Sequence, residues 1–510
     1  MSLKKRLLSV LAVVCLAGVL FETGLSGMKV PVTERKPKDI SGEKKTIYFW
    51  YTDDALTDYI NSAAINFIEI YGVRVIPVLK SGTEYLEAVN EASLKEEQIP
   101  DAYLLSNDLI GKASMAGLTT DVTDSIYCNT DYFPQAALYA TSYHGDVVAF
   151  PYYYETSAYL YNRTYLKEFV KTAAEAEKDR EAAEAAQKKL KEEGASPEED
   201  SQAAEKEESH EMTEEELEKK VQELLPKTMN DLLAFADVYV APENVEAVLK
   251  WDVSDIFYNY YFIGKYMVVG GESGDDTSRI DIYNREAIEC LKAYQKLNQF
   301  FYIDPDTVTY DSVLQDFIDG KEVFTVVTND ALERLEQAKE EGRFKYEYGI
   351  MQVPRISDTL EGRSLSVTNA VAVNGYSKHQ EEARAFAEFI TVGYLDNLYK
   401  RTGKMASGYL APCTDDNAKQ FMKEYEQSIP MPKMVETSNF WLELEILFSR
   451  VWTGENINGL VRGLSEQMMT QITGEPFEEE YIEEIEEKQE ESNEFVDDGE
   501  GITDEDVVAH

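Results

Sequence analysis

The sequence is poor in the residues that most often carry out catalytic or metal chemistry. Histidine, cysteine and tryptophan each occur only four times in 510 residues. The cysteines lie far apart and form no Cys-x-x-Cys pair, so the sequence indicates neither a zinc site nor a disulfide scaffold. Only His144 and His379 lie outside the acidic segments 168–224 and 475–510, which argues against histidine acid–base catalysis. We therefore expect no bound metal and no cofactor.

The motifs of common enzyme classes are also missing. The chain contains no His-Glu-x-x-His, no Gly-x-Ser-x-Gly, no glycine-rich phosphate loop and no dinucleotide fingerprint. The aspartate-rich loop 271–281 lacks the ligand spacing of an EF-hand, so we favour a solvated turn over a calcium site. Carboxylates are so numerous that a glycosidase-like pair is expected by chance. The sequence thus favours a binding protein over an enzyme.

Positive charge is scarce. Lysine and arginine total 49 against 96 acidic residues, which gives a net charge of −47 and excludes nucleic acid as a partner. More than half of this charge falls in segments 168–224 and 475–510. With 44% hydrophobic residues, the remainder is long enough for two domains or one two-lobed unit. We expect a charged helical insertion at 168–224 and an acidic disordered tail at 475–510.

The N-terminus has the pattern expected of an export signal. Three basic residues at 4–6 precede the apolar stretch 7–21, which is typical of a secretory signal and short for a membrane span. Leu16-Ala17-Gly18 resembles a lipoprotein signal, but Val19 stands where the lipid-accepting cysteine belongs. We predict a signal peptide or N-terminal anchor at 1–27 and a linker at 28–45. The protein should be exported to the extracellular face of the cytoplasmic membrane, with a lipid anchor in doubt.

Strands and helices alternate after the linker. Predicted strands 46–51, 73–78 and 102–105 are separated by helices near 56–68 and 85–97, a β-α-β-α-β order that indicates a parallel α/β lobe. Thr52 or Asp53 can cap the first helix. Ligands of such sheets lie at the carboxyl ends of the strands, where Asp53, Asp54 and Asp108 fall.

The rest of the chain continues this α/β pattern. Further strands are expected at 147–156, 158–162, 323–327, 348–353 and 366–373. Helices are expected at 229–240, 251–268, 284–302, 309–319, 380–391, 414–428, 439–453 and 457–472.

The segment 168–224 interrupts the pattern. A helix over 167–193 is followed by Thr213-Glu214-Glu215-Glu216, a capping box that starts another helix. A helical hairpin is expected. It is either a solvated insertion, which we favour, or an arm that docks a partner.

Several motifs together resemble a known family. They are Pro100-Asp101-Ala102-Tyr103, Gly145 to Pro151 followed by Tyr161-Asn162-Arg163, Phe317 to Lys321, and Met431-Pro432 followed by Asn439-Phe440-Trp441. Over residues 46–474 the chain resembles the extracellular solute-binding proteins of bacterial ABC importers, in particular their sugar-binding group. The resemblance implies a two-lobed, periplasmic-binding-protein-like (type II) α/β fold with ligand in the interlobe cleft. The first lobe would comprise 46–150 and 370–418, and the second 156–366 and 422–474.

The resemblance also suggests site residues. Asp53, Asp108 and Glu155 match carboxylates that accept hydrogen bonds from sugar hydroxyls, and Trp441 matches an aromatic platform. Leu105, Asp54 and Asp330 stand where maltose-binding relatives have Trp, Lys and Trp, so maltose itself is not predicted. Neutral sugars need carboxylates and aromatic faces, and the full set of candidate ligand-binding residues is Tyr51, Asp53, Asp54, Asp108, Tyr153, Glu155, Trp251, Asp330 and Trp441.

The expected function is that of the substrate-binding component of an ABC importer. A monomer would bind a carbohydrate, expected to be an oligosaccharide, by hinge closure and deliver it to the transmembrane permease subunits. One alternative keeps the receptor but makes the ligand cationic, an amino sugar or a polyamine, because five candidate carboxylates would crowd one cleft. Others are a secreted glycoside-active enzyme and an adhesion protein that uses the 168–224 hairpin.

Overall fold

The computed structural model describes residues 45–95, 98–193, 212–413 and 415–483. The predicted signal segment 1–27, nearly all of the linker and most of the tail lie outside the described residues. The strands are β1 Thr46–Tyr51, β2 Arg74–Leu79, β3 Ala102–Ser106, β4 Ser142–Tyr143, β5 Asp146–Val147, β6 Phe150–Asn162, β7 Ala247–Leu249, β8 Val268–Val269, β9 Ile280–Asp281, β10 Glu322–Thr328, β11 Tyr348–Met351, β12 Leu365–Val373, β13 Met405–Ala406 and β14 Ile429–Pro430.

Helices occupy most of the remaining described chain. The α-helices are α2 Thr57–Tyr71, α3 Tyr85–Lys95, α4 Ile110–Met115, α5 Gln135–Ala140, α6 Arg163–Glu193, α7 Glu214–Leu224, α8 Met229–Val238, α9 Ile256–Asn259, α10 Arg285–Phe301, α11 Tyr310–Ile318, α12 Ala331–Glu340, α13 Gln380–Glu388, α14 Leu398–Thr402, α15 Asp416–Gln427, α16 Phe440–Trp452 and α17 Ile457–Thr473. Within the described residues no helix combines the length and the apolar character needed to cross a membrane.

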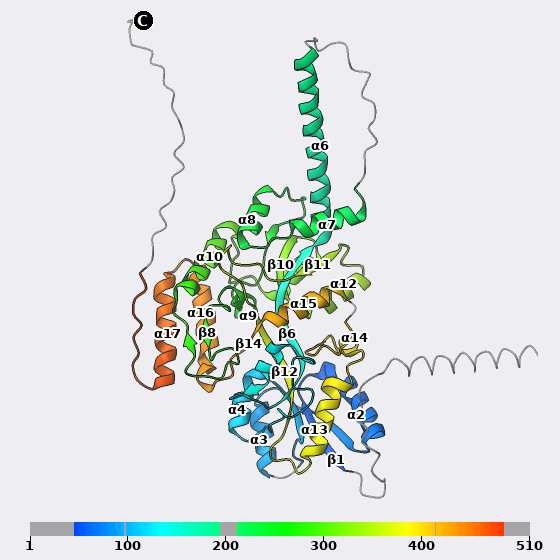
Figure 1. Cartoon of the computed structure of the whole chain (residues 1–510), viewed down its shortest axis with the longest axis vertical. Coiled ribbons are helices and arrows are strands. Elements are labelled where there is room, and N and C mark those ends of the chain that lie inside the picture. The colour runs from blue at the N-terminus through cyan, green and yellow to red at the C-terminus, as the bar shows by residue number, and fades with distance from the viewer. Residues whose placement is uncertain (1–44, 96–97, 194–211, 414, 484–510) are drawn as a thin grey trace, which may run out of the picture. The chain divides into compact units, whose positions relative to one another are not determined.

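The central sheet has the order β2-β1-β3-β12-β6-β10-β7. Figure 1 shows β6 extending from beside β12 toward β10. β1 pairs in parallel with β2 and with β3, which confirms the β-α-β-α-β prediction for the first part of the chain. Helices α2 and α3 return the chain between these strands, as parallel pairing requires. The carboxyl ends of β1 and β3 therefore meet at one edge of the sheet.

Strand β6 joins two halves of this sheet. Its residues 150–156 pair antiparallel with β12, and its residues 157–161 pair antiparallel with β10. We call the half built on β1, β2 and β3 the first lobe, and the half built on β10, β7 and β11 the second lobe. The two strands predicted at 147–156 and 158–162 are thus one continuous strand that crosses between the lobes.

Each half of the sheet has its own apolar core. In the first lobe, α2 and α13 pack on the sheet through Phe67 and Phe386, whose rings meet edge to face at 5.2 Å. In the second lobe, α11, α12 and α15 pack around Leu314, Leu335 and Phe421. The residue boundaries proposed for the lobes stay predictions.

Side chains tie the second lobe to the crossing strand. After β10 the chain turns at Asn329, whose side-chain oxygen accepts the Thr156 N–H at 3.3 Å and whose amide donates to the Tyr154 carbonyl at 2.9 Å. Asn329 is only 3% exposed. Since it satisfies two backbone groups of β6, the turn after β10 is fixed beside the strand that links the lobes.

The predicted helix over 251–268 is wrong. Only α9 and a short 3-10 helix at 260–262 form there. Asp255 caps α9 by accepting the Phe257 N–H at 2.8 Å, so the helix cannot extend back to Trp251. The aromatic run that suggested a long helix instead inserts Tyr260, Tyr261 and Phe262 into the core.

The insertion and the tail are described only in part. The predicted capping box is confirmed: Thr213 and Glu216 exchange side-chain and backbone hydrogen bonds at the start of α7. α6 and α7 pack together, and Lys167 contacts Glu347 at 2.7 Å. At the start of the tail the structure differs from the expected disorder, because Ser465 donates to Glu479 at 2.6 Å and the Phe477 N–H donates to Thr470 at 3.1 Å.

Candidate functional site

The first component of the site is Asp53, at the carboxyl end of β1. One carboxylate oxygen accepts the Ala55 N–H at 3.0 Å, so of the two candidate caps, Thr52 and Asp53, it is Asp53 that caps the short 3-10 helix Asp54–Leu56. The other lies 2.9 Å from the ammonium of Lys404. The cap holds the carboxylate at the strand end, where the parallel sheet was expected to present ligand-binding groups.

Lys404 is positioned by the short strand β13. Met405 and Ala406 pair with Tyr154 and Tyr153 of β6, which brings Lys404 beside the crossing strand. Its ammonium lies 3.8 Å from Glu155 and 5.4 Å from the ring centroid of Tyr153. A single lysine thus joins the end of β1 to the crossing strand.

The second lobe contributes Asp330, just after β10. The Tyr310 hydroxyl donates to its carboxylate at 2.7 Å, and the Thr328 hydroxyl donates to the same oxygen. Arg334 lies 3.7 Å from the other oxygen. The ring of Tyr258 stacks on that of Tyr310 at 4.9 Å, so Asp330 stands at the edge of an aromatic pair.

We call Asp53, Tyr153, Glu155, Asp330 and Lys404 the Lys404 cluster. Partial burial raises the pKa of Glu155 above its usual range. The charge of Lys404 acts to lower this pKa, and the charges of Asp330 and Asp53 act to raise it. Burial alone would lower the pKa of Lys404. The hydrogen bond with Asp53 and the negative charges of Asp53, Glu155 and Asp330 outweigh this effect, so the pKa of Lys404 is raised. Lys404 is therefore charged at neutral pH.

The structure brings together four of the nine predicted site residues, Asp53, Tyr153, Glu155 and Asp330. Two others are corrected to core positions. Trp251 is fully buried, donates its indole N–H to Asn259 at 2.8 Å and packs edge-on against Trp452. Tyr51 is 2% exposed. Neither side chain offers a surface to a ligand. Tyr153 is also buried, at 4% exposed, and belongs to the cluster through the contact of its ring with Lys404.

The remaining three predicted residues keep some exposure. Asp54 follows Asp53 and accepts from the Thr57 hydroxyl at 3.2 Å. Asp108 accepts from the Ser106 hydroxyl at the end of β3. Trp441, at the start of α16, is half-buried against Tyr260, with the ring centroids 5.7 Å apart. These contacts do not tie them to the Lys404 cluster.

Sequence reasoning missed Lys404, Tyr310 and Thr328. Thr328 directly follows the predicted strand 323–327, so the rule that ligands gather at strand ends could have found it. Tyr310 lies in the first turn of the predicted helix 309–319. Lys404 depends on a two-residue strand that no periodicity indicates.

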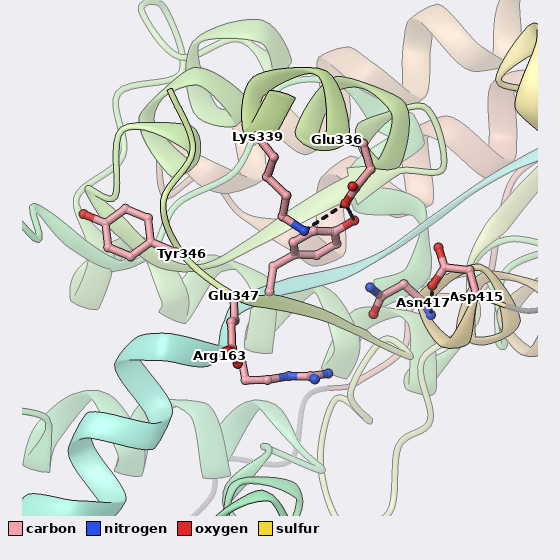
Figure 2. Close-up of a pocket in the computed structure, with 8 residues that line it drawn as sticks. Arg163, Glu336, Lys339, Tyr346, Glu347, Asp415 and Asn417 are labelled. Atoms are coloured by element: carbon pink, nitrogen blue, oxygen red, sulfur yellow. Dashed lines mark hydrogen bonds and ion pairs between the residues drawn. The ribbon is translucent and has the colours of Figure 1, made fainter. Parts of the chain in front are cut away.

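Two pockets lie apart from the cluster. One, of about 460 Å³, is lined by Arg163, Glu336, Lys339, Tyr346, Glu347, Tyr348, Asp415 and Asn417. Figure 2 shows Glu336 and Lys339 directed toward each other from the same helix, α12, and their charged atoms lie 2.9 Å apart. Glu336 also accepts from the Tyr348 hydroxyl at 3.0 Å. The pocket's acidic and basic groups are thus largely matched within the protein.

The other pocket, of about 840 Å³, lies between the 143–145 turn, the 270–279 loop and residues 433–436. Lys433 is 1% exposed and donates to the carbonyls of Tyr139 and Ala140 at 2.6 and 3.1 Å. Burial lowers the pKa of Lys433 to about 7. Asp275 accepts the His144 N–H at 2.8 Å and is 7% exposed. The aspartate-rich loop is thus partly buried rather than the solvated turn we expected.

Metal and disulfide chemistry find no support in the described part of the chain. It contains no group of three or more His, Cys, Asp or Glu side chains arranged to hold a metal ion. Cys128, Cys290 and Cys413 are free thiols.

Comparison with known proteins identifies the protein family to which the chain belongs. Residues 63–431 match the model of the family described as bacterial extracellular solute-binding protein. The chain belongs to this family. No curated protein matches the chain.

Solved structures agree on the fold. An extracellular solute-binding protein from Staphylococcus aureus, in complex with maltose, is 17% identical with a TM-score of 0.64, over 85% of this chain and 99% of that one. A maltose-binding periplasmic protein from Listeria monocytogenes, also with maltose, is 18% identical with a TM-score of 0.63, over 85% and 99%. A cyclo/maltodextrin-binding protein with maltotetraose is 17% identical with a TM-score of 0.62, over 86% and 98%. These likenesses establish the two-lobed α/β fold.

Proposed function

We propose that the protein is the extracytoplasmic substrate-binding component of an ABC importer, and that it binds a carbohydrate, an oligosaccharide, between its lobes. Family membership supports the receptor role. The three structural relatives named above carry maltose or maltotetraose. Binding would close the hinge, and the closed form would deliver the sugar to the permease.

The observation that carries this proposal is the composition of the Lys404 cluster. Asp53 comes from the first lobe, Tyr153 and Glu155 from the crossing strand, and Asp330 from the second lobe. A ligand that touches groups from both lobes favours the arrangement in which those groups are close together. Its differential affinity for that arrangement is what shifts a hinge equilibrium.

The chemistry of the cluster suits a polyol. Glu155 and Asp330 have side chains 46% and 51% exposed, so their oxygens remain available to accept hydrogen bonds from sugar hydroxyls. The half-buried Tyr310 supplies an aromatic surface beside Asp330, and the buried Tyr258 ring stacks on it and holds it in place. A few convergent polar groups beside aromatic rings are typical of small-molecule sites.

A thermal-shift screen tests the proposal. The purified chain without its first 27 residues would be heated with neutral oligosaccharides, amino sugars, polyamines and peptides. We expect at least one neutral oligosaccharide to raise the melting temperature by about 1 °C or more, because a ligand that binds only the folded state stabilises it.

A matched variant makes the screen specific. Glu155→Gln should lose the shift, whereas Glu361→Gln, at an exposed residue paired with Lys265, should keep it. No response to any neutral oligosaccharide would contradict the carbohydrate proposal. Turnover of a glycan that Glu155→Gln abolishes would replace the receptor with an enzyme.

A further inference from the structure

The carboxylates of the cluster already have a cation of their own. Lys404 is 2.9 Å from Asp53 and 3.8 Å from Glu155, and its side chain is only 24% exposed. Its ammonium also faces the Tyr153 ring at 5.4 Å, a cation–π arrangement that adds to the attraction. The position that a ligand ammonium would take between Asp53 and Glu155 is filled by the protein.

The second lobe repeats this pattern. Asp330 has Arg334 at 3.7 Å and two hydroxyl donors, Tyr310 and Thr328. Arg334 itself is held by Asp311 at 2.8 Å and lies over the Tyr310 ring at 5.6 Å. Each carboxylate of the cluster is thus matched by a cation that belongs to the chain.

We propose that Lys404 determines the ligand class of the site: it is a built-in counter-ion that reserves the Asp53–Glu155 position for uncharged ligands and excludes amino sugars and polyamines. This inference rests on the proposed function, because it concerns the same site. It decides between the two ligand classes that the sequence left open. A second ammonium near Lys404 would meet like-charge repulsion in a partly desolvated place.

Lys404 leaves hydrogen-bonding capacity for a neutral ligand. An ammonium has three N–H donors, and the short contact with Asp53 uses one of them. A sugar hydroxyl can accept from Lys404 and donate to Glu155 at the same time. Lys404 is thus both a specificity-determining residue and a positioning residue for the two carboxylates.

The test removes the charge and keeps the shape. Titration calorimetry would measure binding of a glucosamine trimer, its neutral N-acetylated form and spermidine to wild type, Lys404→Met and Lys404→Arg. Lys404→Met should bind the glucosamine trimer and spermidine about tenfold or more tighter than wild type, with an affinity that falls as salt is added. Lys404→Arg should not.

Two further variants test whether the loss of any lysine, or a change other than charge at position 404, is enough to increase cation binding. Lys265→Met removes an exposed paired lysine of the second lobe and should leave binding unchanged. The double variant Asp53→Asn/Lys404→Met restores the charge balance and should lose the gain in cation binding. If Lys404→Met fails to fold, Lys404→Gln provides the same comparison.

Each outcome has a clear meaning. The inference is overturned if Lys404→Met binds spermidine and the glucosamine trimer no more tightly than wild type does. It is also overturned if wild type binds either cation as tightly as it binds the neutral N-acetylated trimer. If wild type binds no neutral sugar while the variant gains cation binding, the inference stands and the carbohydrate proposal fails. The two failures are therefore distinguishable.

Discussion

At the scale of single residues, buried carboxyl groups are stabilised to different degrees. Asp101, 4% exposed, accepts the Tyr48 N–H at 2.8 Å and the Ser377 hydroxyl at 2.6 Å. Glu424, 3% exposed, accepts from Ser364 at 2.7 Å and Val353 at 3.2 Å, and burial raises its pKa to about 7. A buried charge without such partners is costly. The cost should appear in the pH dependence of folding.

Glu322, at the start of β10, is the clearest test. It is 1% exposed, and neither carboxyl oxygen has a hydrogen-bond partner among the described residues. Lys250 lies 3.8 Å away but is held closer by Asp316, at 2.6 Å. Burial therefore dominates and raises the pKa of Glu322 well above its usual range.

The sign of the pH effect follows from this shift. Below the ordinary pKa of glutamate, both the folded and unfolded states are protonated and no stability is lost. As pH rises toward the folded-state pKa, the unfolded chain releases the proton and the folded chain keeps it, so the free energy of unfolding falls. Glu322→Gln should gain stability relative to wild type by about 1 kcal/mol or more at pH 8 and by much less at pH 4.

Urea unfolding of both proteins at pH 4 and pH 8 measures the difference. Glu246→Gln is the control, since its side chain is 62% exposed beside Lys321, and it should show no comparable gain. A Glu322→Gln effect equal at the two pH values would contradict this account.

At the scale of elements, glycines show where backbone geometry positions the site. Gly403 ends α14 with φ of 68°, directly before Lys404. A Cβ there would approach the Glu333 carboxylate at 2.0 Å. Gly463 lies within α17, where a Cβ would meet nothing within 4 Å.

The two positions predict opposite effects of the same substitution. Gly403→Ala should cost about 1–2 kcal/mol because alanine disfavours the left-handed conformation. Gly463→Ala should stabilise the protein by up to about 1 kcal/mol, because alanine is the better helix former. Chemical denaturation of both variants checks the signs. Gly403→Ala with no loss of stability would show that the turn before Lys404 tolerates another geometry.

Prediction from sequence succeeded where elements are long and regular. Strand β1 spans Thr46–Tyr51 as expected, and Asp53 caps the following helix. It failed in the aromatic segment 251–268, where tertiary packing of Trp251 and its neighbours prevailed over helical spacing. It also missed β13, because two residues carry no period. Of the carboxylates of the site, Asp53 could therefore be found from a strand end, and Glu155, inside β6, and Asp330 only from the family resemblance. Their counter-ion Lys404 could be found from neither.

At the scale of the whole molecule, the central feature is the strand that belongs to both lobes. β6 carries Tyr153 and Glu155 in its first half and pairs with β10 in its second half. Asp330 follows β10, and Asn329 bonds that turn to β6. The site and the connection between the lobes are thus built from the same segment, so ligand contacts and lobe arrangement should be coupled.

Titration calorimetry with the best neutral oligosaccharide from the screen tests the central claim most directly. Asp53→Asn, Glu155→Gln and Asp330→Asn remove one carboxylate each from the first lobe, the crossing strand and the second lobe. Each should weaken binding by about tenfold or more, since hydrogen bonds to charged groups are the strong ones, while Glu361→Gln should bind as wild type does. Unchanged affinity in all three variants would contradict the assignment of the Lys404 cluster as the carbohydrate site.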